Sequence, residues 1–283
     1  MAVIQGGSIL HDLQEQGILM NPKANVFLVD PTVTAYSLQD AIDECVASQG
    51  DVIVCLPGGQ ELAAAVNFDC AGITVISLNR GINARAQGEY FALYAAATYT
   101  DGPIANITAN CTIIGMGFAS RDTGATFYSG AAALIGGLAT ALPFGVHLKQ
   151  CRFPKWGLDN RIGLAIEGTT ETLIEECIFE GVGADFASGI YVQGATQNLE
   201  IVNCRFRDCT YGIVFGSFAG GGPECIIAHN HFEGSKCLSA ASAATGLVAD
   251  NWLMTATDTG SYSTTVDTLN GYGLQFADQH YAE

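Results

Sequence analysis

A phenylalanine recurs four times in the second half of the chain at nearly constant spacing. The four copies, Phe153, Phe179, Phe206 and Phe232, are separated by 26, 27 and 26 residues. A small residue stands two positions before each of them, in the order Cys151, Cys177, Cys204 and Asn230, and a degenerate fifth copy around Asn251 follows after a shorter step of 21 residues. A repeat of this length predicts a solenoid, in which each coil buries its apolar side only when its neighbours stack on it.

The repeated segments are predicted to be strands. They are rich in Ile, Val, Phe and Cys and lack the leucine framework of a leucine-rich repeat. Further short alternating runs that begin with glycine occupy 163–168, 189–194 and 212–217, as expected for strands between turns. Each coil therefore has at least two strands joined by sharp corners. The expected fold class is all-β, a right-handed parallel β-helix of about eight coils.

The coils resemble those of the pectate-lyase-like superfamily, which read roughly I-x-x-N-x-F followed by G-I-x-V. The resemblance implies that the small residue lies at a tight corner with its side chain inward, where an asparagine hydrogen-bonds to its equivalent one coil away. Cysteine at this corner is a compact filler that is often buried. The phenylalanines should stack at the strand spacing of ~4.8 Å, as a structural interior column. The predicted core ladder comprises Cys151, Cys177, Cys204, Asn230, Asn251, Phe153, Phe179, Phe206 and Phe232.

The chain divides into three parts by this pattern. Residues 1–34 precede the repeat and are predicted to be an N-terminal docking arm, residues 35–253 form the β-helix with insertions at 80–104 and 119–144, and residues 254–283 cap the last coil or pair with a neighbouring chain. Residues 35–79 read as an amphipathic helix with Leu38, Ile42, Cys45 and Val46, followed by strands. A helix over the open end of the stack blocks edge pairing. This segment resembles the cap and first coils of pectate-lyase-like proteins in bacteriophage particles.

Charge and composition exclude several partners. The chain has 28 acidic and 11 basic residues and a net charge of −17, which repels nucleic acid and anionic lipid. No apolar run is long enough to span a membrane. Ten cysteines are present, but several fall on the inward file, and none of them has zinc-binding spacing. We therefore expect free thiols, synthesis in a reducing cytoplasm, and neither a metal nor a cofactor.

Candidate catalytic residues are few. Enzymes that resemble these coils use either an acidic calcium cluster with a basic proton acceptor or carboxylates grouped on neighbouring coils. Glu180, Asp185 and Asp208 lie near predicted corners and are the weak candidates if the protein is an enzyme. Glu167 aligns with Gln193 and Ser217, which leaves one carboxylate where a hydrolase needs a pair.

Two outward rows carry charge. The position after each phenylalanine holds Pro154, Glu180, Arg207 and Glu233, which predicts a charge-matched ladder. The position before each phenylalanine holds Arg152, Ile178, Arg205 and His231, with Trp252 in the degenerate copy. This second row either grips an anionic glycan or only makes the face soluble.

The two predicted insertions supply candidates for an interface between subunits. Tyrosines suit interfaces and small residues permit close approach; the alternative is that both insertions fold back over their own helix. The interface candidates are Tyr90, Phe91, Tyr94, Tyr99, Leu134 and Ile135.

Two main functions follow from the resemblance. We favour a non-enzymatic structural protein of a bacteriophage virion, a homotrimeric decoration or cement protein on the capsid surface whose partners are itself and the major capsid protein or other virion proteins. The alternative is a tailspike-like polysaccharide lyase or glycoside hydrolase acting on host surface glycans. A cellular carbohydrate-binding β-helix is a third interpretation, because one scaffold carries many functions.

Overall fold

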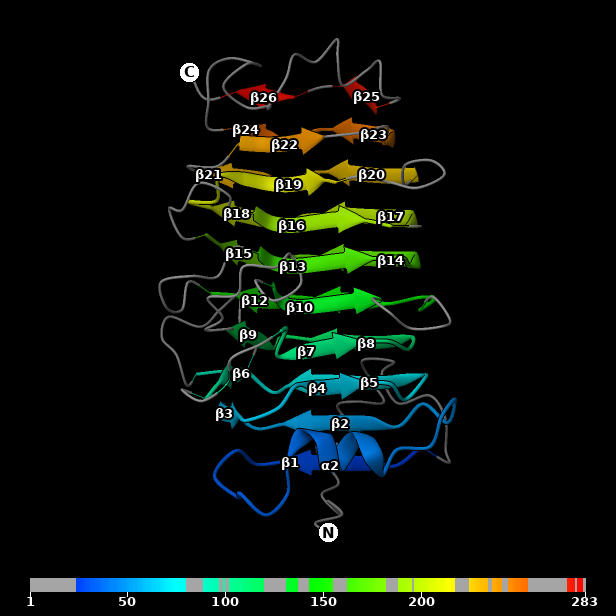
Figure 1. The fold of residues 1–283 in the computed structure, drawn as a ribbon, viewed down its shortest axis with the longest axis vertical. Helices are drawn as coiled ribbons and strands as arrows, with labels where there is room; N and C mark the ends of the chain where they lie inside the picture. The colour runs from blue at the N-terminus through cyan, green and yellow to red at the C-terminus, as the bar shows by residue number, and fades with distance from the viewer. Residues whose placement is uncertain are drawn as a thin grey trace.

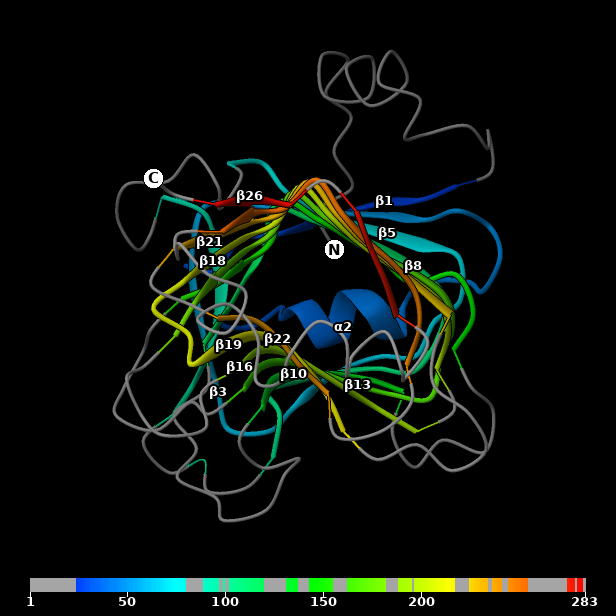
Figure 2. The ribbon, with the colours of Figure 1, turned by 90° about the horizontal axis from the view of Figure 1, so that it is seen from above.

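The chain folds into a column of stacked parallel strands (Figure 1). The structure, a computed structural model, describes residues 24–79, 89–96, 99, 102–119, 131–136, 143–154, 162–181, 188–194, 196–216, 224–233, 236–240, 244–253, 274–277 and 279–281. Seen along the column, the strands form three walls around one interior (Figure 2). Every strand pairing between the described residues is parallel, which confirms the parallel β-helix.

Sheet A is the longest wall, with ten strands against the expected eight or so coils. In order along the sheet these are β1 (Val26–Val29), β2 (Val52–Cys55), β5 (Ile73–Ser77), β8 (Cys111–Ile114), β11 (His147–Lys149), β14 (Thr170–Glu175), β17 (Gln197–Val202), β20 (Glu224–Ala228), β23 (Thr245–Ala249) and β25 (Leu274–Ala277).

Sheets B and C form the other two walls. Sheet B contains β3 (Gly58–Leu62), β6 (Phe91–Ala95), β9 (Gly117–Ala119), β12 (Arg152–Phe153), β15 (Ile178–Glu180), β18 (Arg205–Arg207), β21 (His231–Glu233), β24 (Trp252–Leu253) and β26 (His280–Tyr281). Sheet C contains β4 (Val66–Phe68), β7 (Ala105–Ile107), β10 (Ala131–Gly136), β13 (Ile162–Glu167), β16 (Ser188–Gln193), β19 (Tyr211–Phe215) and β22 (Lys236–Ala240).

The repeated phenylalanines form a stacked interior column on sheet B. Neighbouring rings from Phe153 to Phe232 have centroids 4.6, 5.0 and 4.7 Å apart and planes within 9° of parallel. Phe118 extends the column by one ring, 5.3 Å from Phe153. The glycines of sheet C make room for these rings, because a Cβ at Gly212 would lie 2.2 Å from the ring of Phe232. Packing against the column therefore explains the glycine of each G-I-x-V run.

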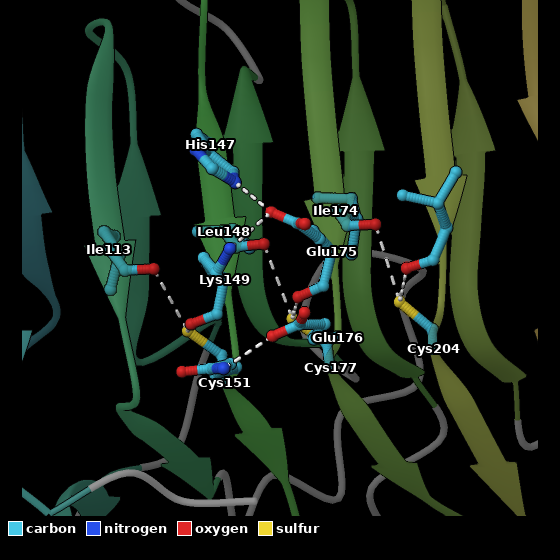
Figure 3. Close-up of polar contacts among 12 residues, drawn as sticks. Ile113, His147, Leu148, Lys149, Cys151, Ile174, Glu175, Glu176, Cys177 and Cys204 are labelled. Atoms are coloured by element: carbon cyan, nitrogen blue, oxygen red, sulfur yellow. Dashed lines mark hydrogen bonds and ion pairs between the residues drawn. The ribbon is translucent and has the colours of Figure 1, made fainter.

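The small residues before the phenylalanines line the corner between sheets A and B. Cys151, Cys177 and Cys204 each donate an S–H to a backbone carbonyl of the preceding coil, over 3.4, 3.6 and 3.5 Å, respectively (Figure 3). The side-chain amides of Asn230 and Asn251 donate to the corresponding carbonyls over 2.8 and 3.0 Å. Burial raises the pKa of the Cys151 and Cys177 thiols well above its ordinary value, so both stay protonated.

A left-handed backbone conformation turns the chain at this corner. The residue before each small residue has φ between 53° and 59°, in the order Gln150, Glu176, Asn203, His229 and Asp250. Asn, Asp and His tolerate this conformation better than most residues other than glycine. The corner therefore shares a backbone conformation one position before the core ladder, and three of these five residues are of a type that adopts it readily.

The helix predicted at the start of the β-helix is present but short. Helix α2 (Leu38–Asp43) begins at Ser37, whose hydroxyl accepts from the backbone N–H of Asp40 while the Asp40 carboxylate accepts from the backbone N–H of Ser37. It lies at the N-terminal end of the stack, inside the outline of the coils (Figure 2), with Leu38 and Ile42 buried. Cys45 and Val46 fall beyond it, because Asp51 accepts from the backbone N–H of Val46 and holds a turn there. Among the described residues no helix has the length and hydrophobicity to cross a membrane.

The predicted boundaries differ from the structure at four places. The end of the docking arm is strand β1, paired with β2. The described parts of the predicted insertions contain β6 and β10, each paired with neighbours on both sides. In the C-terminal segment, β25 and β26 continue sheets A and B. These strands were not predicted from the sequence because their coils lack the [Cys/Asn]-x-Phe unit.

Candidate functional site

The outer face of sheet B carries two files of outward side chains along the stack, most of them charged or aromatic. The strand register places Arg152, Ile178, Arg205, His231, Trp252 and His280 in one file, which we call the basic-aromatic file. Glu180, Arg207 and Glu233 are aligned in the second, which we call the charge file. Successive side chains in a strand point to opposite faces, so both files lie outside while the phenylalanine column between them lies inside.

The two files are linked by ion pairs. The Glu180 carboxylate accepts from Nε and Nη2 of Arg152 over 3.2 and 2.8 Å and lies 3.9 Å from Arg207. Glu233 accepts from Arg207 over 2.9 Å, from Arg205, and lies 3.2 Å from His231. The charges therefore alternate from coil to coil, as the sequence predicts, and neighbouring coils are joined across the outer face.

These pairings change the pKa values of their members. Burial opposes the charge on Arg152, but the hydrogen bonds and negative charge of Glu180 outweigh it and raise the pKa of the guanidinium. The hydrogen bond from Arg205 lowers the pKa of Glu233 against the effect of burial, with further help from Arg207. A general acid in a glycosidase needs the opposite, a carboxyl group whose pKa is raised.

Two of the three carboxylates considered as catalytic candidates, Glu180 and Asp208, lie within the described residues. Glu180 is held by Arg152, and it aligns with Arg207, one residue before Asp208. Asp208 is exposed at a corner with φ of 53°, and Asp185 lies outside the described residues. Glu167 does align with Gln193, whose amide donates to it over 3.4 Å, while Ser217 lies outside the described residues. Within the described residues, no group of three or more His, Cys, Asp or Glu side chains is placed to hold a metal ion.

The C-terminal end of the basic-aromatic file is an exposed aromatic surface. The indole of Trp252 is 49% exposed. Its ring centroid lies 6.3 Å from that of His231 on one side and 5.9 Å from that of His280 on the other, and the plane of His280 is tilted from it by 26°. His280 lies 3.9 Å from the carboxylate of Asp250. Three consecutive coils thus present three rings, with charged side chains beside them.

Sequence reasoning found His231 and Trp252 but missed His280. The corner residue of the last coil is Gln279 rather than Cys or Asn, and no phenylalanine follows it. Gln279 nevertheless continues the core ladder, because its side chain accepts from Asn251 over 3.3 Å and donates to the backbone carbonyl of Val248 over 2.8 Å. The coil therefore keeps the corner chemistry of the core ladder without its [Cys/Asn]-x-Phe unit.

Three of the six interface candidates are buried within the chain. Phe91 and Ile135 point into the core of the stack, and Tyr90 is covered on the outer side of sheet B, where it lies over Gly117. Their strands alternate between inner and outer positions, which the sequence pattern did not reveal. Tyr94, Tyr99 and Leu134 are half-buried, and the hydroxyl of Tyr99 donates to the backbone carbonyl of Pro103 over 2.7 Å. Contact of these three with a second subunit stays a prediction.

Comparison with known families identifies the fold family. The model of the family described as right handed beta helix region matches residues 100–253, more than half of the chain. The chain belongs to the right-handed β-helix family. No curated protein sequence matches this β-helix protein.

Three solved structures share the fold at low sequence identity. The catalytic domain of a GH87 alpha-1,3-glucanase in complex with nigerose superposes with a TM-score of 0.60 at 11% identity, covering 93% of this chain and 46% of that chain. A mutant of the PL6 family alginate lyase AlyGC has a TM-score of 0.58 at 11% identity, covering 93% of this chain and 41% of that chain. The pectin methylesterase from Aspergillus niger has a TM-score of 0.51 at 11% identity, covering 92% of this chain and 86% of that chain. This β-helix protein therefore spans less than half the length of the glucanase and the lyase.

Proposed function

We propose that this β-helix protein binds an extended polysaccharide along the outer face of sheet B without cleaving it. The observation that carries the proposal is Trp252, an exposed indole between two imidazoles on consecutive coils. An indole offers a flat apolar surface on which the C–H face of a sugar ring stacks. Arg205 and Arg207, both in β18 on the coil next to that of His231, carry N–H groups that can donate to sugar hydroxyls or carboxylates.

The charge file supports binding rather than cleavage. Glu233 accepts hydrogen bonds from Arg205 and Arg207, which lower its pKa, whereas a general acid requires the protonated form. The files also continue over several coils, which suits a ligand longer than one sugar. The glucanase and the alginate lyase are named for polysaccharides, but their likeness to this chain is one of fold, so the proposal rests on the outer face itself.

The test uses soluble polysaccharides as probes. The intact protein is titrated by calorimetry with alginate as an anionic probe and with dextran as a neutral one, and Trp252→Ala is compared with Ile178→Ala, a change in the same file away from the aromatic surface. We expect Trp252→Ala to weaken binding by about tenfold or more, because hot-spot aromatics dominate such contacts. An affinity of Trp252→Ala equal to that of wild type would refute the binding site. Release of reducing ends or of unsaturated uronic acids would refute the non-enzymatic role.

A second candidate function is attachment to a bacteriophage capsid as a homotrimeric decoration protein. The observation that favours it is the exposure of two apolar residues near the N-terminal end of the stack: Val33, which precedes α2 in the sequence, is 49% exposed, and Val46, which follows it, is 46% exposed. Exposed apolar side chains of this kind suit contact with another protein. Immunogold labelling of purified particles tests the proposal; labelling over the shell supports it, and absence from particles contradicts it.

A further inference from the structure

The outer face of sheet A carries an exposed apolar centre near the C-terminal end of the stack. The strand register aligns Glu200, Ile226, Leu247 and Gln275 on four consecutive coils. Ile226 is 42% exposed and Leu247 is 39% exposed. A shallow hollow of about 590 Å³ lies over them, and Asn198 and Glu224 also line it. We call Glu200, Glu224, Ile226, Leu247 and Gln275 the acidic-apolar patch.

Exposure of this kind is not a general property of the face. At the N-terminal end of sheet A, the outward side chains Val52 and Val54 are fully buried and Ile76 is 8% exposed. In the middle of the face, Glu175 pairs with Lys149 over 3.1 Å and with His147 over 3.2 Å, so the charges there compensate one another (Figure 3). The C-terminal third of the described face instead combines exposed apolar side chains with acidic side chains that form no ion pair with another described residue.

The charge on the patch has one sign. Glu200 and Glu224 are exposed and form no ion pair with any other described residue. The four strands β17, β20, β23 and β25 contain no lysine or arginine. A second copy of this chain would bring the same acids and a net charge of −17 against them. Nucleic acid and anionic lipid are repelled for the same reason.

We infer that the acidic-apolar patch binds a basic amphipathic segment of another protein. Apolar side chains of the segment would cover Ile226 and Leu247, and lysine or arginine side chains beside them would meet Glu200 and Glu224. The apolar contact stabilises the complex while the charges at the edge increase the association rate and exclude acidic partners. The inference concerns a different wall from the proposed polysaccharide site and does not depend on it.

The probe is a fluorescent amphipathic peptide of leucine and lysine, with a peptide in which glutamate replaces every lysine as its control. Binding to the intact protein is measured by fluorescence anisotropy at two salt concentrations. We expect the lysine peptide to bind and the glutamate peptide not to bind. Leu247→Ser and the double variant Glu200→Lys with Glu224→Lys should each weaken lysine-peptide binding by about tenfold or more.

A matched charge reversal elsewhere on the protein distinguishes binding at the patch from non-specific attraction of the lysine peptide to an acidic protein. Glu61 and Asp69 are exposed near the N-terminal end of the stack, so Glu61→Lys with Asp69→Lys changes the net charge equally away from the patch. A loss of binding in this control as large as in the patch variant would overturn the inference. Equal binding of the lysine peptide to Leu247→Ser and wild type would also overturn it, as would self-association in sedimentation velocity that Leu247→Ser abolishes. Trp252→Ala should leave peptide binding unchanged, whatever it does to polysaccharide binding.

Discussion

The inner and outer sides of sheet B follow different rules although they share the same strands. Inside, one residue type repeats, and five phenylalanine rings from Phe118 to Phe232 stack with nearly constant spacing. Outside, the residue type changes from coil to coil, and partners such as Arg152 and Glu180 are linked by charge rather than by identity. Stacking needs like shapes at a fixed rise, whereas ion pairing needs unlike charges, so the inner side encodes the fold and the outer side is open to function.

Removing a ring from the column should give the largest effect. Phe206→Ala leaves a void between the rings of Phe179 and Phe232 and should lower the free energy of unfolding by about 3–5 kcal/mol. Ile178→Ala, which removes an apolar group from the outer file, should cost far less. Urea denaturation followed by circular dichroism measures both. Equal losses would mean that the inner and outer sides do not differ as described.

Both asparagine and cysteine occur at the corner between sheets A and B, so one can be substituted for the other at Asn230. Asn230→Ala removes the donor to the Ile201 carbonyl and the acceptor for the Cys204 backbone N–H, and should lower the free energy of unfolding by about 1–3 kcal/mol. Asn230→Cys should cost less than Asn230→Ala, because the thiol occupies the same position in Cys204 and donates to the equivalent carbonyl. Thermal melts of the two variants decide the order, and an alanine variant as stable as the cysteine variant would refute the role of the thiol.

The outer ion pairs should respond to acid. The pKa of Glu233 is lowered in the folded chain from 4.5, first by the hydrogen bond from Arg205. A lowered folded pKa stabilises the protein above the unfolded pKa, and the stabilisation is lost as pH falls through the folded pKa. Near neutral pH the midpoint of thermal unfolding should therefore be higher for wild type than for Glu233→Gln. The difference between the two midpoints should disappear below pH about 4. A gap independent of pH would exclude the carboxylate charge as its source.

The smallest effect concerns thiol labelling. Eight of the ten free cysteines are buried, and Cys45 and Cys70 are the half-buried pair. Burial and the charge of Asp51 raise the pKa of Cys45 to about 12, and the same two causes raise the pKa of Cys70. We expect iodoacetamide to label these two slowly and the other eight only after unfolding, as read by mass spectrometry of digests. Early labelling of Cys177 would contradict a closed corner.

The repeat unit explains which coils could be predicted. Coils that contain a phenylalanine two positions after a cysteine or asparagine were predicted with their strand register, because this unit recurs in the sequence at a nearly constant spacing. Strands β6, β10, β25 and β26 were not, because they pair through backbone hydrogen bonds that any residue can form. Tyr90, Phe91 and Ile135 were expected at an interface between subunits, but Phe91 and Ile135 point into the core and Tyr90 is covered on the outer side of sheet B.

The site divides in the same way. The alternation of Glu180, Arg207 and Glu233 is visible as soon as the coils are aligned, so their charge matching was predicted. The partner of each group was not, since Arg152 reaches Glu180 diagonally on the next coil and only side-chain conformation decides that contact. The aromatic surface required His280, whose coil carries no recognisable repeat.

The amino-acid sequence alone determined the solenoid, its parallel strands and the identity of its inward files, because a repeated side chain at a constant rise has one efficient way to be buried. Tertiary structure decided the rest. It joined the two outer files through ion pairs, placed Trp252 between two imidazoles, and left Ile226 and Leu247 exposed beside acids that pair with no other described residue. These outcomes depend on which side chains of different coils become neighbours, and a repeat that varies at its outer positions does not specify that by itself.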